Sequence, residues 1–228
     1  MSINSILTTV IVLPLISSFA ATPLYNTEME MACNTLVIEQ QIQEATIEEI
    51  TPKETYKLIE EYQIEYTIHD IEYELTDHEL NILACLLQLE VLGKTSSIHD
   101  FKDPGAKFEE LLAVAETVRN RMEMTVFPDS IHEVIFDNFT KKSGQKVYQF
   151  SPAPVLDNCT PTEETYIAAK YIFCGGITIL TEYYGYFCSD QITKSYEYGN
   201  NYCLEKNENG KYISKHIGDT VFYKSRQK

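Results

Sequence analysis

The chain has 228 residues, of which 44% are hydrophobic, and it carries a formal net charge of −16 at pH 7. A chain of this length and apolar content can bury one sizeable core with an extra segment attached. Its acidic balance argues against nucleic acid and anionic lipid as partners, because it contains neither a basic patch nor a basic helix.

Residues 1–20 contain no charged side chain and form an apolar run that ends in Ser18-Phe19-Ala20. Small residues on both sides of Phe19 are typical of a signal-peptide cleavage site. Pro14 and the serines make the run short for a membrane span. We therefore expect a cleaved export signal, with an uncleaved N-terminal anchor as the alternative, and no other integral membrane segment.

The next segment, residues 21–73, holds most of the negative charge. Between Glu28 and Glu74 there are 13 acidic residues and two lysines, so this stretch contributes −11 of the net charge. We expect an acidic linker or arm, a solvated spacer with some helical tendency. Within it, the alternation at residues 62–68 is typical of a short strand.

The folded domain is expected over residues 74–228, and its first helix carries an unexpected carboxylate. Thr76 and Glu79 form a capping box that starts the helix. Glu90 falls on the apolar stripe of this helix, in the last turn before Gly93 ends it. The stripe comprises Leu80, Leu83, Ala84, Leu87 and Val91.

Burial and the negative end of the helix dipole both disfavour a charged carboxylate at Glu90. A carboxyl group that stays protonated near neutral pH can donate a proton, so Glu90 is a candidate general acid. The alternative is a structural glutamate at the rim of the stripe, with its carboxylate in water or paired with Lys94.

Three further helices are predicted downstream. Residues 107–124 form an amphipathic helix, and Ser130 with Glu133 forms a second capping box that begins a short helix. Thr160 is the expected cap of the last, with Pro161 at its first position and Gly175 at its end.

Residues 147–158 are expected to be irregular because Pro152 and Pro154 interrupt them. After Gly176 the Tyr- and Thr-rich stretches at 177–190, 195–203 and 216–224 are typical of short strands. The predicted fold class is therefore α+β, mainly helical, with a small β element near the C-terminus.

The chain contains six cysteines and five histidines. No Cys-x-x-Cys pair occurs and no histidine stands at ligand spacing from a Cys or Asp, so we expect no metal site. Cysteines of an exported chain can form disulfides. Cys85 is interpreted as a core residue, and Cys188 with Cys203 is the first pair to test.

Six motifs follow one another in an order that resembles the SleB-like cell wall hydrolases, the family of spore-cortex-lytic enzymes. The resemblance extends from about Leu75 to Lys224. The motifs are LEVLGK, AVAETVRNR, FPDSIHEVIF, QFSPAPVLDN, PTEETYIAAK and IGDTVFYK. The resemblance implies a fold related to lysozyme and lytic transglycosylases. It also implies cleavage of peptidoglycan glycan strands, with Glu90 at the position of the family's catalytic glutamate.

The chain also departs from the family pattern. Lys94 stands where the family has a second Glu, Leu89 replaces an Ala, and the loop at residues 95–105 is an insertion. These departures favour an alternative function, that of a non-catalytic wall or spore-coat protein that retains the fold. An amidase or peptidase is a weaker alternative, because neither metal ligands nor an activated nucleophile is evident.

Glycosidases commonly use two carboxylates, but Asp100, Asp103 and Asp157 all stand among turn residues, where Asp usually caps or is solvated. A single buried Glu90 suits the lytic transglycosylase route, which needs no metal or cofactor. Gln149 and Ser151 are candidates for hydrogen bonds to the glycan. Candidates for other substrate contacts are Asn120, Phe150, Tyr184 and Tyr186, for which a structural role is the alternative.

The expected partner is therefore a peptidoglycan glycan strand. The expected location is secreted, at the cell envelope or the spore cortex, and the resemblance implies a part in germination.

Overall fold

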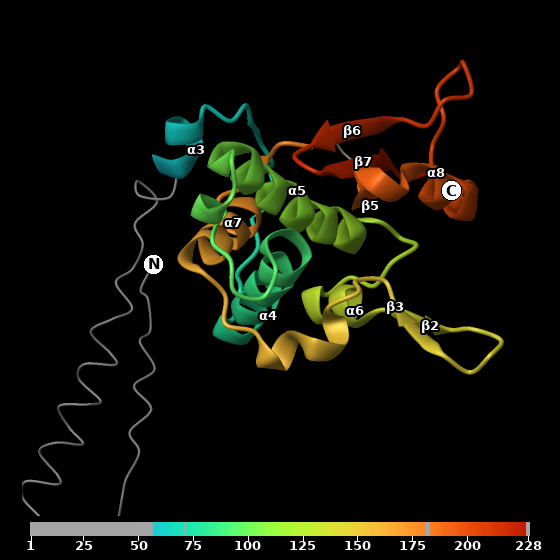
Figure 1. The fold of residues 1–228 in the computed structure, drawn as a ribbon, viewed down its shortest axis with the longest axis horizontal. Coiled ribbons are helices and arrows are strands. Elements are labelled where there is room, and N and C mark those ends of the chain that lie inside the picture. The colour runs from blue at the N-terminus through green and yellow to red at the C-terminus, as the bar shows by residue number, and fades with distance from the viewer. Residues whose placement is uncertain (1–56, 71, 181–182, 227–228) are drawn as a thin grey trace, which may run out of the picture. The chain divides into compact units, whose positions relative to one another are not determined.

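The structure is a computed structural model that describes residues 57–70, 72–180 and 183–226. The predicted export signal and most of the predicted acidic arm lie outside the described residues. Six α-helices and three small sheets make up the described part, which confirms the predicted α+β class (Figure 1).

The helices are α3 (Lys57–Tyr62), α4 (Asp77–Leu87), α5 (Pro104–Glu123), α6 (Ile131–Phe136), α7 (Glu163–Phe173) and α8 (Thr193–Asn200). Four short helical turns join them: η1 (Gln88–Leu92), η2 (Ile98–Asp100), η3 (Ala153–Asn158) and η4 (Asp190–Ile192). The strands are β1 (Thr67–Ile68), β2 (Asn138–Thr140), β3 (Lys146–Tyr148), β4 (Ile177–Thr178), β5 (Tyr184–Ser189), β6 (Ser214–Ile217) and β7 (Thr220–Lys224).

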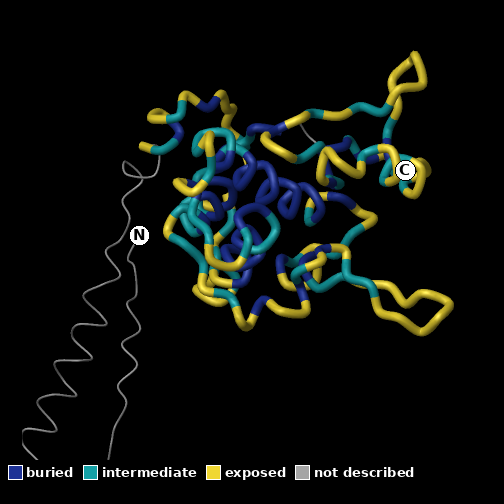
Figure 2. The backbone as a smooth tube through the Cα atoms, viewed as in Figure 1, coloured by how far each residue is buried: buried dark blue, intermediate teal, exposed yellow. Residues whose placement is uncertain are grey.

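Helix α5 is the centre of the core. It packs against α4 and α7 on one side and against β5 and β6 on the other. Figure 2 shows α5 and α4 as the most deeply buried helices. The residues expected on the apolar face of α5 are buried, namely Phe108, Leu111, Leu112, Ala115 and Val118, whereas Met122 is half-buried.

Two buried charges of α5 fix the chain that follows α7. The Glu116 carboxylate accepts hydrogen bonds from the backbone amides of Ile179 (2.7 Å) and Leu180 (2.8 Å). The Arg119 guanidinium lies 3.4 Å from Glu116 and donates to the Ile172 carbonyl at 2.7 Å. Buried charges are tolerated when they are paired and hydrogen-bonded, so this pair positions the turn that leads into the C-terminal sheet.

The C-terminal sheet has the strand order β5-β7-β6, with both pairs antiparallel. Strands β5, β6 and β7 of this sheet, together with β4 of a separate two-stranded sheet, account for the strands predicted at 177–190 and 216–224. The stretch at 195–203 was wrongly predicted as a strand, because residues 193–200 form helix α8. The ring of Tyr196 stacks on that of Tyr223 with 5.6 Å between centroids, which gives α8 an apolar contact with the sheet.

The predicted helix starts are confirmed at two places. The backbone amide of Thr76 donates to Glu79 at 2.9 Å and the amide of Glu79 donates to the Thr76 hydroxyl at 3.2 Å. At Ser130 the structure shows the serine half of the predicted box, because the Ser130 hydroxyl accepts from the amide of Glu133 and so caps α6. A capping box and a serine cap satisfy amides that the first turn leaves unpaired, which is why these residues start helices.

Thr160 was wrongly predicted as the cap of α7, which begins at Glu163 with Thr162 as its cap residue. The amide of Thr162 donates instead to the side chain of Gln88 at 3.0 Å, a long-range contact that local sequence cannot reveal. Residues 147–158 were also expected to be wholly irregular, but they include the end of β3 and the 3₁₀ turn η3.

The last residues of the predicted acidic arm pack on the domain. Ile59 of α3 is 1% exposed and Ile64 is buried in the same core. Strand β1 pairs with β4 through Ile68 and Ile177. The arm therefore contributes core side chains from α3 onward. Across the described residues, no helix combines the length and apolarity that a membrane span requires.

Candidate active site

The first feature of the site is the way α4 ends. After Leu87 the helix widens into a single π turn over Gln88–Leu92, and Glu90 lies in the middle of that turn. The amide of Gly93 donates to the Gln88 carbonyl, five residues back, at 2.8 Å. Gly93 has a φ of 85°, a conformation that glycine adopts without strain. The predicted stop at Gly93 is confirmed, but the π turn, a feature frequent at functional sites, was not foreseen.

Gln88 holds this turn in place. Its side chain is fully buried, and its amide nitrogen donates to the carbonyls of Gly93 (2.8 Å) and Ser96 (2.7 Å). Its amide oxygen accepts from the backbone amide of Thr162 at 3.0 Å. One side chain thus links the segment after Glu90 to the start of α7. Sequence reasoning missed Gln88, whose only signal is an amide within an apolar run.

Glu90 itself is half-buried. Burial raises the pKa of its carboxyl group from 4.5 to about 7. The backbone amide of Ser151 and the positive charge of Arg121 act in the opposite direction, because both stabilise the carboxylate. In this environment Glu90 exists in both protonation states near neutral pH. A group of this kind can donate a proton and later accept one.

Arg121 is the second residue of the site that sequence reasoning missed. It is 3% exposed, and its Nε donates to the Gly185 carbonyl at 2.7 Å. Its guanidinium lies 4.5 Å from the ring centroid of Phe150, and two further aromatic rings, those of Phe127 and Tyr186, surround it at 5.0 and 5.5 Å. Such cation–π contacts stabilise a buried cation. The sequence signal was a charged residue on a helix otherwise rich in core residues.

The Nη1 atom of Arg121 forms no hydrogen bond with any residue that the structure describes. Burial lowers the pKa of this guanidinium, and the negative charges of Asp137 and Glu90 counteract that effect. Arg121 therefore places a buried positive charge near Glu90, with one of its nitrogen atoms not engaged in a hydrogen bond. An unpaired buried donor is costly, so this one is suited to a carboxylate that forms during a reaction.

The predicted substrate contacts fall into two groups. Ser151 and Gln149 are exposed, and the Ser151 amide is the one that bonds Glu90, so this segment borders the candidate acid. Tyr186 is half-buried and lines a pocket of about 140 Å³ together with Met124 and Tyr202. These three predicted residues are within reach of a ligand.

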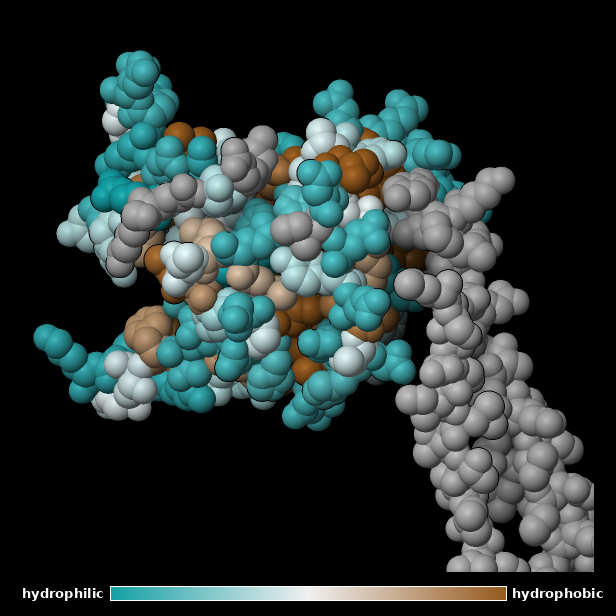
Figure 3. All heavy atoms as spheres, turned by 180° about the vertical axis from the view of Figure 1, so that it is seen from behind, coloured by the Kyte–Doolittle hydropathy of each residue, from teal (hydrophilic) through white to brown (hydrophobic). Residues whose placement is uncertain are grey.

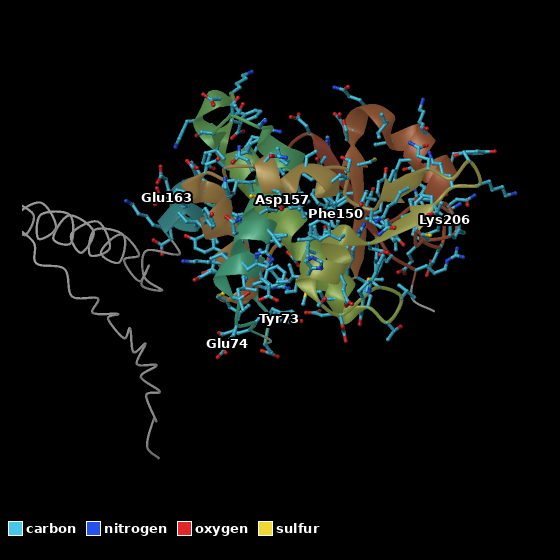
Figure 4. The ribbon with its side chains drawn as sticks, turned by 90° about the horizontal axis from the view of Figure 1, so that it is seen from below. Tyr73, Glu74, Phe150, Asp157, Glu163 and Lys206 are labelled. Carbon is cyan, nitrogen blue, oxygen red and sulfur yellow. The ribbon has the colours of Figure 1, made fainter. Side chains whose placement is uncertain are left out.

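The other three predicted contacts are interior residues. Phe150 is 1% exposed and lies beneath the Arg121 guanidinium, and Figure 4 places it near the middle of the domain. Tyr184 is buried, and its carbonyl accepts from the Asn120 side chain at 3.1 Å. Stacking on a sugar needs an open ring face, so the structure favours the structural alternative for Phe150, Tyr184 and Asn120.

Of the three aspartates considered as a second carboxylate, two cap helical segments and the third is exposed to solvent. Asp100 accepts from the amide of Ser97 at 2.8 Å, and Asp103 accepts from the amide of Ala106 at 3.0 Å as the cap of α5. Asp157 and Lys94 are exposed. Among the described residues, the groups that shift the Glu90 pKa are Ser151 and Arg121, and neither carries a carboxylate.

Cys188 and Cys203, the pair to test first, are both free thiols in the structure. The Cys188 thiol forms a hydrogen bond with Tyr223, and the Cys203 thiol forms one with Tyr186. Within the residues that the structure describes, no group of three or more His, Cys, Asp or Glu side chains could hold a metal ion.

Figure 3 shows the domain from behind and reveals a recess between the β2–β3 hairpin and the C-terminal sheet. Apolar residues line part of this recess. The hairpin itself is exposed along most of its length and carries Lys141, Lys142 and Lys146 without an acidic residue. The molecule therefore presents a hollowed face with one basic arm.

Comparison with known proteins gives one family match. A family model described as cell wall hydrolase matches residues 105–223, which is more than half of the chain. The match begins after Glu90, so the position of the candidate acid rests on the geometry described above. No curated protein matches this chain.

Two solved structures are similar to the chain at low identity. The catalytic domain of the germination-specific lytic transglycosylase SleB from Bacillus anthracis is 18% identical, with a TM-score of 0.44 over 68% of this chain and 100% of that one. The catalytic domain of the Bacillus cereus SleB protein is 16% identical, with a TM-score of 0.39 over 68% of this chain and 95% of that one. Scores of this size carry no argument about activity.

Proposed function

The chain belongs to the cell wall hydrolase family, a class of enzymes that cleave peptidoglycan at the cell envelope, and on that premise we propose that it cuts the glycan strand with Glu90 as its general acid. The observation that carries the proposal is the environment of the Glu90 carboxyl group. This group is half-buried on a rigid turn, has a pKa of about 7, and faces a backbone amide and a buried cation.

In the first step, the protonated Glu90 donates its proton to the oxygen of the glycosidic bond, and the bond to the anomeric carbon breaks as positive charge develops on the sugar. The carboxylate left behind is stabilised by the amide of Ser151 and by Arg121. Donors already aimed at a charge that appears during the reaction lower the barrier without a reorganisation cost.

In the second step, the Glu90 carboxylate accepts a proton from the 6-hydroxyl of the muramic acid residue, and that oxygen closes on the anomeric carbon to give an anhydro ring. Glu90 is then protonated again, ready for another cycle. This lytic transglycosylase route needs one carboxyl group. Direct hydrolysis normally needs a second carboxylate as nucleophile or base.

The surroundings of Glu90 support the single-acid route. Asp100 and Asp103, the first two acids that follow Glu90 along the chain, already cap η2 and α5. A carboxylate that satisfies helix amides is poorly placed to activate water, because its lone pairs are engaged. The alternative of a non-catalytic wall protein gains no support here, since a half-buried carboxyl group with a raised pKa near a buried guanidinium has no evident structural purpose.

The test is a digest of purified vegetative peptidoglycan and of spore cortex with the full chain, alongside Glu90→Gln and the exposed control Glu208→Gln. Soluble products are identified by mass spectrometry. We expect anhydro-muramic ends from the wild type and the control, and none from Glu90→Gln. Reducing ends in place of anhydro ends would establish hydrolysis and refute the single-acid route. Equal, negligible release from all three proteins would refute the enzymatic function.

A further inference from the structure

A pair of cysteines far apart in the sequence meets beside the candidate active site. Cys85 lies in α4, one turn before the π turn of Glu90, and Cys159 follows η3 directly. The Cys85 Sγ atom is 3.7 Å from the Cys159 carbonyl oxygen, and the Cys159 Sγ atom is 3.7 Å from the Cys85 carbonyl oxygen. The two thiols also form a hydrogen bond with each other.

This reciprocal contact means that each side chain points at the backbone of the other residue. A disulfide needs the two Cα atoms within about 7 Å and side chains that converge. The mutual sulfur-to-carbonyl contacts, together with the thiol–thiol contact, bring the two side chains together from opposite segments, which is the convergence that a disulfide needs.

We propose that Cys85 and Cys159 are a disulfide-forming site, which a low-molecular-weight disulfide such as oxidised glutathione converts into a covalent link between α4 and the segment after η3. Neither the family nor the proposed reaction requires this link. The inference therefore stands or falls independently of the proposed function.

The difference in exposure between the two cysteines determines which thiol reacts first. Cys159 is half-buried, whereas Cys85 is 1% exposed, so only Cys159 can meet the oxidant. The Cys159 thiolate attacks one sulfur of oxidised glutathione and releases one molecule of glutathione. Cys85 then loses its proton, attacks the Cys159 sulfur and releases the second glutathione, so that two protein thiols are oxidised and one disulfide is reduced.

The second step is expected to be the slower one. Burial raises the pKa of the Cys85 thiol to about 12, with further increases from the adjacent Cys159 thiol. Only the thiolate is nucleophilic, and the thiolate fraction of such a group is small at neutral pH. A mixed disulfide between Cys159 and glutathione is therefore expected as a transient intermediate.

The link would reinforce a junction that is already held by hydrogen bonds. Cys85 and Cys159 are 74 residues apart, and so are Gln88 and Thr162, whose contact pins α7 to the turn of Glu90. Cys85 and Gln88 are three residues apart, about one helical turn, and their partners Cys159 and Thr162 are separated by the same number of residues. A disulfide at the first contact would lock the second, and with it the segment whose Ser151 amide bonds Glu90.

The test uses the full chain, folded and reduced, then incubated with oxidised glutathione. Protease digestion without reduction, followed by mass spectrometry, identifies the linked peptides. We expect a peptide pair joined through Cys85 and Cys159 with the loss of two hydrogens. In Cys159→Ser the pair must disappear, whereas in the control Cys174→Ser, which removes an exposed cysteine, it must remain.

The midpoint of thermal unfolding provides an independent readout. Closing a ring of this length should raise Tm by roughly 10 °C in the wild type and in Cys174→Ser, and reduction should reverse the shift. Stable glutathionylation of Cys159 without release, or links to other cysteines in place of Cys85, would overturn the proposal. The wild-type peptide map decides this even if Cys159→Ser does not fold.

Discussion

Replacement of Glu90 by Gln separates the energetic effect of the buried carboxyl group from its chemical role. In the folded chain the pKa of Glu90 is about 7, against an ordinary value of 4.5. The folded state therefore holds this proton more tightly than the unfolded state does. By linkage, the free energy of unfolding must fall as the pH rises from about 4.5 to about 7, and it must level off above that range.

The magnitude follows from the shift of roughly 2.5 pH units, each worth about 1.4 kcal/mol. At pH 8 the charged Glu90 costs the folded state about 3 kcal/mol, whereas at pH 5 the cost is about 1 kcal/mol. Gln is neutral at both values and nearly the same shape. Glu90→Gln should therefore be more stable than the wild type at pH 8, with a smaller advantage at pH 5.

The assay is thermal unfolding of the wild type and Glu90→Gln at both pH values. A change of about 2 kcal/mol between pH 5 and pH 8 corresponds to roughly 4–8 °C in the Tm difference for a chain of this size. Glu208→Gln, an exposed residue in a turn, is the matched control and should show no such pH dependence. A Tm difference between wild type and Glu90→Gln that does not vary with pH would refute the inference that burial keeps Glu90 protonated. The same variant should lose activity by about 10²–10⁴-fold, the usual contribution of a general acid.

Three further outcomes are expected. The kcat/KM of the wild type on peptidoglycan should fall about tenfold per pH unit above pH 7, as Glu90 loses its proton, and a profile still flat at pH 9 would contradict this. Gln88→Ala leaves two carbonyls and one amide unpaired, so chemical denaturation should show a loss of roughly 2–4 kcal/mol together with lower activity. Glu116→Ala removes the carboxylate that pairs with the buried Arg119 and with two backbone amides, so the free energy of unfolding should fall by about 3–5 kcal/mol in the same measurement. A loss under about 1 kcal/mol would show that the pair is dispensable.

Local signals in the sequence were sufficient for the helices that begin with a side-chain cap. Thr76, Glu79 and Ser130 form contacts within three residues, so their patterns report directly on the structure. The start of α7 was misplaced because Thr162 is fixed by Gln88, which is 74 residues away in the sequence. Helix α8 was missed for a similar reason, since the contact of Tyr196 with Tyr223 depends on the completed sheet.

The same distinction applies to the candidate site. Glu90 could be singled out because a carboxylate in an apolar stripe is anomalous within one helix. Arg121 could not be recognised in this way, because its significance lies in the rings of Phe127, Phe150 and Tyr186, which come from separate segments. The aromatic residues proposed as sugar-stacking groups include Phe150, whose ring is enclosed in the core, and sequence alone cannot tell an enclosed ring from an open one.

The contacts of Gln88 have a consequence for how this enzyme can change over time. Because its side chain anchors the carbonyls of Gly93 and Ser96, the chain leaves the neighbourhood of Glu90 along a fixed path. Beyond Ser96 the loop is held by its own caps at Ser97 and Asp103. Residues can be added or exchanged between these anchors without moving the carboxyl group. Exposed positions between the anchors, such as His99 and Lys102, can therefore be exchanged while the contacts that hold the turn of Glu90 stay in place.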